Sequence, residues 1–385
     1  MKRILPIIVV AQFFCTSLWF AGNAILPNII QTFHLQNDFL AHLTSAVQLG
    51  FISGTLVFAL LAIADRFSPT LVFFISAMIA ALCNLGIALP DVNATFLLGS
   101  RFLTGFFLAG IYPVGMKITS DHYQQGLGKS LGWLVGAFVL GTALPHLLKT
   151  LTASVDWESV VFFTSSLAIL GGSSLYFFVP NGPYRKQGQK LRLTSFLAGF
   201  RIKTFRIAAF GYFGHMWELY TFWAFVPVML ATFQVSHLDK TLNIPLLSFL
   251  IIASGCLACV LGGWFSQRYG VKKVATVALA LSCACCLVSP LFLMGDSFIA
   301  LLVFLIFWGM VVIADSPLFS TLIAQNAPQE NRGTALTIVN CVGFSLTIFS
   351  IQFLNLSMLS FNIHSVYMLL AIGPILGLIA LLQKP

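Results

Sequence analysis

The sequence predicts an all-α membrane protein with twelve transmembrane helices in two pseudo-symmetric six-helix bundles. Of its 385 residues, 58% are hydrophobic and only 8% are charged, whereas soluble domains carry roughly 25% charged residues. Backbone polar groups need internal partners in lipid, so a chain crosses a membrane as helices or as a closed barrel. Barrel strands alternate apolar and polar residues, and this chain shows long continuous apolar runs instead. We therefore expect helices.

The apolar runs have the length that a bilayer requires. A spanning helix needs roughly 20 predominantly apolar residues, and prolines, glycines and charged residues mark the interruptions. The amino-terminal run lacks a small-residue cleavage site after a short apolar core, so we expect an uncleaved first helix. The expected spans are residues 4–30, 41–63, 70–89, 95–119, 129–150, 159–179, 205–232, 245–265, 274–294, 297–322, 334–355 and 365–382.

One connection is long and basic, and it divides the chain into nearly equal halves. We expect an amino-terminal six-helix half at 1–180, a cytoplasmic linker at 181–204 and a carboxy-terminal six-helix half at 205–385. Apolar residues recur at helical spacing within the linker, which fits an amphipathic helix on the membrane surface. A solvated linker is the alternative.

The positions of the basic residues indicate the orientation. With both termini and the linker on one side, that side holds seventeen of the 20 Lys and Arg residues. Lys149 and Lys240 fall on the other side, and Arg101 lies within a span. Basic loops face the cytoplasm, so we expect both termini there, an even number of spans and, as the location, a bacterial inner membrane. The net charge of +9 thus reflects the orientation of the chain in the lipid bilayer, and we expect no nucleic acid partner. We also expect a monomer.

The two halves share short sequence features. The first span of one half ends with AILP at residues 24–27, and the first span of the other carries AFVP at 224–227. Weak internal symmetry of this kind is typical of transporters built from repeats related by an axis along the membrane normal.

Motifs after the second and eighth spans carry a family resemblance. Residues 263–273 (GWFSQRYGVKK) follow the pattern G-x-x-x-D-R-x-G-R-R, with Gln267 in place of the acid. Asp65 and Arg66 occupy the acid and arginine positions in the first half, and residues 101–105 give R-x-x-x-G in the fourth span. With twelve spans and a basic linker, the chain resembles the major facilitator superfamily of secondary transporters.

The resemblance implies a mechanism. In this superfamily two six-helix halves rock to give alternating access, and the first, fourth, seventh and tenth helices line a central cavity. It further implies a gate at the loops that carry Asp65, Arg66 and Arg268, where a carboxylate can cap a helix of the other half. The alternative for these loops is orientation and helix capping alone.

Three charged residues lie inside the expected spans: Arg101, Glu218 and Asp315. A charge there costs about 2.5–3.5 kcal/mol on insertion scales, so it marks function by default. All three fall on helices that the resemblance places around the cavity. The expected spans 3, 6, 9 and 12 carry no charge in their interiors.

Glu218 is the principal candidate for proton coupling, because it lies near the bilayer midplane and can exchange a proton as access alternates. His215 is three residues away on the same helical face and titrates near neutral pH. Asp315, just before Ser316-Pro317, is the third candidate. The alternatives are a structural hydrogen bond that Glu218 accepts from Arg101 or a hydroxyl, packing for His215, and bracing of a kink for Asp315.

The cavity candidates suggest an organic solute. Arg101 could bind an anionic substrate group or brace the fold. The further substrate-binding candidates are Gln12, Trp19, Asn23, Trp217 and Tyr220.

We expect a proton-coupled transporter of a small organic solute. The alternative is a multidrug or amphiphile exporter, which the aromatic residues and the glycines of the fifth span favour. A non-transporting membrane receptor is a remote alternative. Since no nucleotide motif is visible, we expect no ATP drive. We find no clustered nucleophile and base and no set of metal ligands in the sequence, so we expect no enzymatic activity, no metal and no cofactor.

Overall fold

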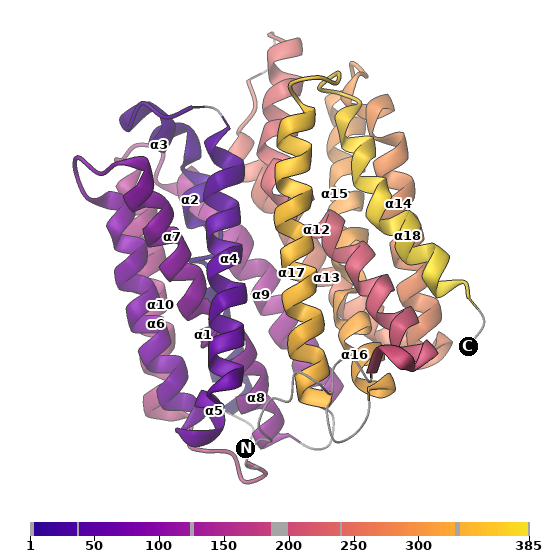
Figure 1. Ribbon diagram of the computed structural model, residues 1–385. Helices are drawn as coiled ribbons and strands as arrows, with labels where there is room; N and C mark the ends of the chain where they lie inside the picture. Colours follow the sequence, from indigo (N-terminus) through magenta and orange to yellow (C-terminus); the bar gives the residue numbers. More distant parts are fainter. Residues whose placement is uncertain are drawn as a thin grey trace. The chain divides into compact units, whose positions relative to one another are not determined.

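The computed structural model describes residues 4–36, 38–123, 127–185, 199–238, 241–327 and 332–383, and within these ranges all regular elements are helical. The chain forms two compact units, Met1–Leu191 and Arg192–Pro385 (Figure 1). The predicted all-helical fold is confirmed. Residues 186–198 of the linker lie outside the described ranges, so the choice between a surface helix and a solvated linker stays open.

Eleven helical elements are described in the first unit. They are α1 (Ile4–Thr16), α2 (Ala21–Ala24), α3 (Leu26–Thr32), α4 (Phe39–Leu60), α5 (Ile63–Arg66), α6 (Pro69–Leu85), η1 (Gly86–Ala88), α7 (Ala94–Leu108), α8 (Tyr112–His122), α9 (Leu127–Leu151) and α10 (Glu158–Phe178). The second unit contains α12 (Lys203–Ser236), α13 (Ile244–Tyr269), α14 (Val271–Leu293), α15 (Phe298–Ala314), α16 (Ser316–Asn326), α17 (Arg332–Ser357), η3 (Val366–Ala371) and α18 (Ile372–Leu381).

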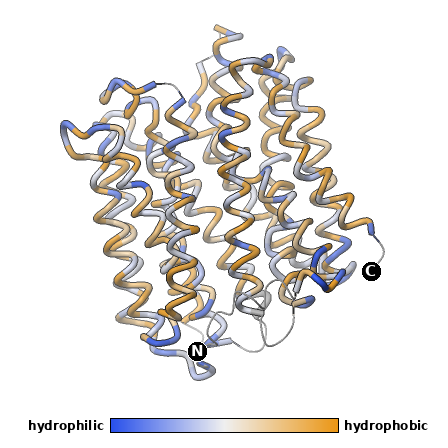
Figure 2. The backbone as a smooth tube through the Cα atoms, in the orientation of Figure 1, coloured by the Kyte–Doolittle hydropathy of each residue, from blue (hydrophilic) through white to orange (hydrophobic). Residues whose placement is uncertain are grey.

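Ten helices in the described ranges are long and apolar enough to cross a membrane, and they coincide with the second to the eleventh predicted spans. The first and last predicted spans contain shorter apolar helices, Ile4–Thr16 and Val366–Leu381. Apolar residues cover most of each helix, and hydrophilic residues gather toward the helix ends (Figure 2). The total of twelve spans stays a prediction, because the two terminal helices are shorter than a bilayer crossing requires.

Three predicted spans are interrupted rather than continuous. The first breaks between α1 and α3, the fourth between α7 and α8, and the tenth at Asp315 between α15 and α16. Each later segment carries a proline in its first turn, namely Pro27, Pro113 or Pro317. Proline lacks the N–H that would continue the helix and favours the first helical turn. The breaks place polar backbone atoms inside each bundle.

Glycines allow the closest helix pairs in each unit. A side chain at Gly50 of α4 would overlap the backbone of Phe102 on α7, and one at Gly105 would overlap that of Val47. In the second unit, a side chain at Gly309 of α15 would overlap the backbone of Ile251 on α13. Small residues at helix contacts let backbones approach closely in lipid. The second and fourth predicted spans of each half therefore pack alike.

Candidate functional site

Glu218 lies inside the second unit, where only 1% of its surface is exposed. Ser282 of α14 donates a hydrogen bond to its Oε2 at 2.9 Å, and the indole Nε1 of Trp308 on α15 donates to its Oε1 at 2.6 Å. Among the described residues no cation forms an ion pair with Glu218. The carboxyl group is held by neutral donors alone.

His215 and Asp315 form a second buried polar site less than one helical turn before Glu218 along α12. The Nδ1 of His215 lies 2.8 Å from Oδ1 of Asp315, and each side chain is 1% exposed. The break between α15 and α16 places Asp315 beside α12, because Asp315 is the residue that precedes the first turn of α16. Both residues were predicted from the sequence as candidates for proton coupling, and their side chains are in contact in the structure.

Two substrate-binding candidates on α12 lie against other helices. Trp217 packs on Gly373 of α18, and its ring centre is 5.9 Å from that of Phe353 on α17. Tyr220 is buried, with its ring 5.1 Å from that of Phe344, also on α17. Glu218 instead contacts α14 and α15, so these aromatic residues flank a different side of α12. Their role in substrate binding stays a prediction.

Arg101 is fully buried in the first unit. Its guanidinium donates to the carbonyl oxygens of Leu18 at 3.0 Å and Trp19 at 2.6 Å, which lie in the interruption between α1 and α2. It also donates to Oδ1 of Asn84 on α6 at 3.0 Å. Asn84 in turn donates to Ser165 and Thr164 of α10. These contacts join four predicted spans of one unit, and they favour bracing of the broken first span.

Gln12, Trp19 and Asn23 occupy the same broken span. Gln12 is fully buried, and its two amide atoms have no hydrogen-bond partner among the described residues. Trp19 is buried, its ring 4.8 Å from that of Phe51. The amide of Asn23 donates to Oγ1 of Thr44 on α4 at 2.7 Å. All three lie inside the first unit, and their contact with substrate stays a prediction.

Comparison with known proteins identifies the family. A sequence profile described as the Major Facilitator Superfamily matches residues 8–351. The chain belongs to the Major Facilitator Superfamily. Its members are transporters, so this chain is an integral membrane transporter, and the family resemblance seen in the motifs is confirmed.

Two solved structures have the same fold as this superfamily member. The human organic anion transporter MFSD10 (TETRAN) superimposes with a TM-score of 0.78 at 14% identity, covering 99% of each chain. The nucleoside transporter NupG, solved as a mutant, gives a TM-score of 0.75 at 15% identity, covering 99% of this chain and 100% of that one. At these identities the similarity shows the fold alone.

One curated relative shares a short segment with the chain. The niacin transporter NiaP of Acinetobacter baylyi (strain ATCC 33305 / BD413 / ADP1) is 33% identical over 94 residues. The match covers 22% of this chain and 21% of that transporter. It therefore leaves the substrate of this superfamily member open.

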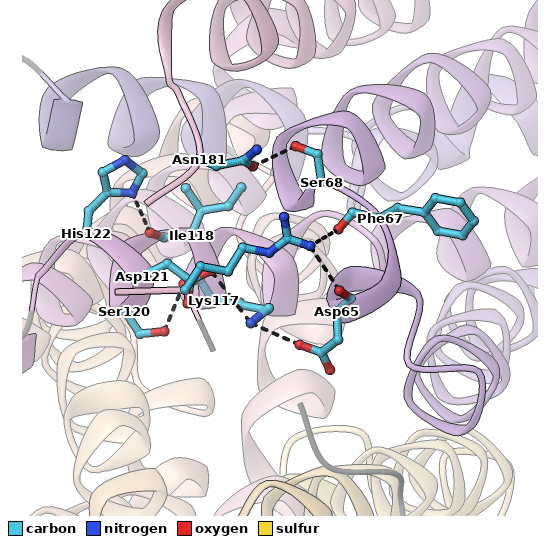
Figure 3. A network of polar contacts seen from close by, with 10 residues as sticks. Asp65, Phe67, Ser68, Lys117, Ile118, Ser120, Asp121, His122 and Asn181 are labelled. Carbon is cyan, nitrogen blue, oxygen red and sulfur yellow. Dashed lines mark hydrogen bonds and ion pairs between the residues drawn. The ribbon is translucent and has the colours of Figure 1, made fainter. Parts of the chain in front are cut away.

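The superfamily motif at Asp65 forms a polar network within the first unit (Figure 3). The amine of Lys117 on α8 lies 3.0 Å from Oδ1 of Asp65 and 3.6 Å from Oδ2 of Asp121. Arg185, in the first part of the linker, donates to the carbonyl oxygens of Asp65 at 2.9 Å and Phe67 at 2.7 Å. These contacts connect the motif loop to α8 and to the start of the linker.

The other two gate candidates are exposed. Arg66 lies on the surface, and no ion pair is found for it within the described part of the chain. Arg268 is exposed as well, with its guanidinium carbon 5.4 Å from the ring centre of Tyr269. The gate role of Asp65, Arg66 and Arg268 stays a prediction.

We expect Asp65→Asn to lower the free energy of unfolding by less than about 1 kcal/mol, because a partly exposed ion pair contributes about 0.2–1 kcal/mol. Lys117 keeps Asp121 as a partner in the variant. Unfolding of the purified protein in mixed detergent and SDS micelles measures the change. Asp121→Asn is the matched control, and a loss of several kcal/mol in Asp65→Asn alone would show a further partner of Asp65.

We expect His215 and Asp315 to be coupled by about 1–3 kcal/mol, as contacting buried residues are in double-mutant cycles. The cycle uses His215→Asn, Asp315→Asn and the double variant in the same unfolding assay. The exposed pair His237 and Asp296, 3.4 Å apart, gives a control cycle with coupling below about 0.5 kcal/mol. Equal coupling in the two cycles would contradict a specific role for the buried contact.

Several residues that contact the candidate site residues were not singled out from the sequence. Asn84 stands alone as an amide in an apolar run, which is the signal that could have found it. Lys117 and Asp121 are four residues apart, the spacing of a helical ion pair. Ser282 and Trp308 carry no comparable signal, because hydroxyls and indoles are common in spans. Within the described ranges no group of three or more His, Cys, Asp or Glu residues could hold a metal ion.

Proposed function

We propose that the chain is a proton-coupled secondary transporter that moves a small organic solute by alternating access. The superfamily assignment supports transport itself. The observation that supports proton coupling is Glu218, a buried carboxyl group within a span, held by Ser282 and Trp308 and paired with no cation among the described residues.

A carboxyl group in this position links proton binding to conformation. A buried charge without an ionic partner is costly, whereas the same group exposed to water is well solvated. Proton exchange at Glu218 therefore depends on whether its surroundings are open to water. A ligand that binds two conformations unequally shifts their balance, so the proton can drive the alternation.

His215 and Asp315 supply a second candidate for proton exchange. They lie on the same side of α12 as Glu218, because Asp315 closes α15 and Trp308 belongs to α15. A proton on the imidazole makes the contact an ion pair, and its loss leaves one uncompensated carboxylate. We propose that this site adjusts the charge beside Glu218.

The substrate class rests on the superfamily. The named carriers transport an organic anion, a nucleoside or niacin, and all three are polar organic molecules of modest size. We propose a solute of this general kind. The contacts of Arg101 with the carbonyl oxygens of Leu18 and Trp19 favour a bracing role for it over a substrate contact.

An exporter of amphiphiles is the alternative. Gly141 of α9 lies so close to Thr16 and Phe13 of α1 that a side chain there would overlap both. This close contact fits the glycine pattern that favours export. The direction of solute movement in the experiment below separates the two proposals.

The orientation and location are part of the proposal. Both termini are proposed to be cytoplasmic in a bacterial inner membrane, and the support is the one-sided distribution of Lys and Arg in the loops. We also propose that the protein functions as a monomer.

A thermal-shift screen of metabolites on purified protein, followed by solute flux in proteoliposomes, tests the function. We expect an imposed pH gradient to drive accumulation of the identified solute above equilibrium. A protonophore should abolish the accumulation but leave exchange of labelled for unlabelled solute intact. Accumulation that ignores the pH gradient would contradict proton coupling.

A further inference from the structure

A groove of about 660 Å³ opens in the second unit where α13 ends and α14 begins. One part of its lining is basic and the other is apolar. The residues that matter here are Lys272, Lys273, Val277, Leu322, Leu381 and Leu382. The groove belongs to the second unit alone, and it contains neither Glu218 nor the contact between His215 and Asp315.

The motif loop that leads into the basic part of the groove has no acid at the position that Asp65 occupies in the first unit. In the first unit Asp65 pairs with Lys117, and Arg185 binds the same loop. In the second unit Gln267 takes the position of the acid. No ion pair involving Lys272 or Lys273 is found in the part of the chain that the structure describes. Two adjacent positive charges therefore line the groove, with no carboxylate paired to them among the described residues.

The backbone adds to this positive potential. Lys272 and Lys273 lie in the first turn of α14, a helix of 23 residues, whose start at Gly270 has no side-chain cap. The first N–H groups of a helix are free to bind an anion, and the helix dipole favours negative charge there. The two lysines and the amino-terminal end of α14 create a positive potential at the same end of the groove.

The apolar part of the groove extends away from the lysines. Val277 of α14 is 51% exposed, and Leu382, directly after the end of α18, is 74% exposed. A free inorganic anion would gain no binding free energy from these apolar side chains. An acyl chain would gain binding free energy from them, because burial of apolar surface contributes about 25 cal/mol per Å².

We propose that this groove binds an anionic phospholipid, with its phosphate at Lys272 and Lys273 and an acyl chain along Val277 and Leu382. Charge complementarity selects the anionic headgroup over a zwitterionic one. Each basic residue near an anionic membrane surface contributes enough to change affinity about fivefold. The lipid links α14 to α18, because Leu381 and Leu382 lie at the end of α18.

Native mass spectrometry of the full chain, titrated with phosphatidylglycerol or phosphatidylcholine, tests the proposal. We expect the wild type to prefer phosphatidylglycerol. Lys272→Gln with Lys273→Gln should weaken its binding about 30-fold. Arg201→Gln with Lys203→Gln is the matched control, since it removes two exposed positive charges from the same unit, and it should retain the preference.

A second variant covers the case in which the double variant does not fold. Thr276→Asp places an acid among the groove-lining residues, so it should weaken phosphatidylglycerol binding several-fold while the charge of both lysines is kept. Equal affinity for the two lipids in the wild type, or equal losses in the lysine and control variants, would overturn the proposal. Displacement of the lipid by millimolar inorganic phosphate would also overturn it in favour of a free-anion site.

Discussion

Replacing Glu218 by glutamine is expected to abolish proton-driven accumulation of the solute. One pH unit corresponds to about 1.4 kcal/mol per proton, or tenfold accumulation for one proton per uncharged solute. The wild type should approach this ratio across a gradient of one unit, whereas Glu218→Gln should only equilibrate the solute. The measurement is uptake in proteoliposomes, with a solute whose own charge does not change over the pH range used.

The substitution is suited to this purpose because it preserves the local hydrogen bonds. The amide oxygen can still accept from Trp308, and the hydroxyl of Ser282 can accept from the new amide. Exchange of labelled for unlabelled solute should therefore persist and report a folded carrier. Ser282→Ala is the control, since it removes one donor but keeps the carboxyl group. Accumulation by Glu218→Gln equal to that of wild type would contradict the role of Glu218.

Replacing Arg101 by glutamine is expected to produce the largest loss of stability. The guanidinium donates three hydrogen bonds, two of them to carbonyl oxygens in the broken first span. Hydrogen bonds from charged groups contribute about 1.5–3 kcal/mol each, and their loss leaves buried acceptors unpaired. We expect a decrease of about 3 kcal/mol or more in the free energy of unfolding, with a lower midpoint of thermal unfolding.

Arg66→Gln is the matched control for Arg101→Gln, because Arg66 is exposed. It removes an arginine without breaking a buried network, so its midpoint should stay close to that of wild type. Asn84→Leu should fall between the two, since it removes one partner of the guanidinium and leaves both carbonyl contacts. Normal stability of Arg101→Gln together with weakened solute binding would assign Arg101 to the substrate instead.

The fold was predictable because lipid leaves few structures open to an apolar chain. Long apolar runs and turn residues located ten of the helices. The interruptions at Trp19 and Ala109 were not predicted, whereas the proline after Asp315 and Ser316 was expected to disturb the helix there. Proline at the start of α3, α8 and α16 was the available signal, but proline is tolerated inside spans as well. Pro145, Pro227 and Pro290 remain within continuous helices.

The candidate site was predictable as a set of residues rather than as contacts. Arg101, Glu218 and Asp315 were identified by the free-energy cost of placing a charge within a span, because such a charge is functional by default. The partners depend on which faces of two helices meet, and helical spacing within one helix does not give that. The contact of His215 with Asp315 arises from the break after α15, and the hydrogen bond of Glu218 with Trp308 arises from packing of α12 on α15.

Proton movement driven by the solute tests the central proposal most directly. Proteoliposomes without a pH gradient are loaded with a pH-sensitive dye, and an inward gradient of the solute is applied. We predict that wild-type protein changes the luminal pH, with acidification for symport and alkalinisation for antiport, and that Glu218→Gln does not, although both exchange labelled solute. A pH change of equal size in both proteins, or an unchanged luminal pH with wild type, would contradict proton coupling through Glu218.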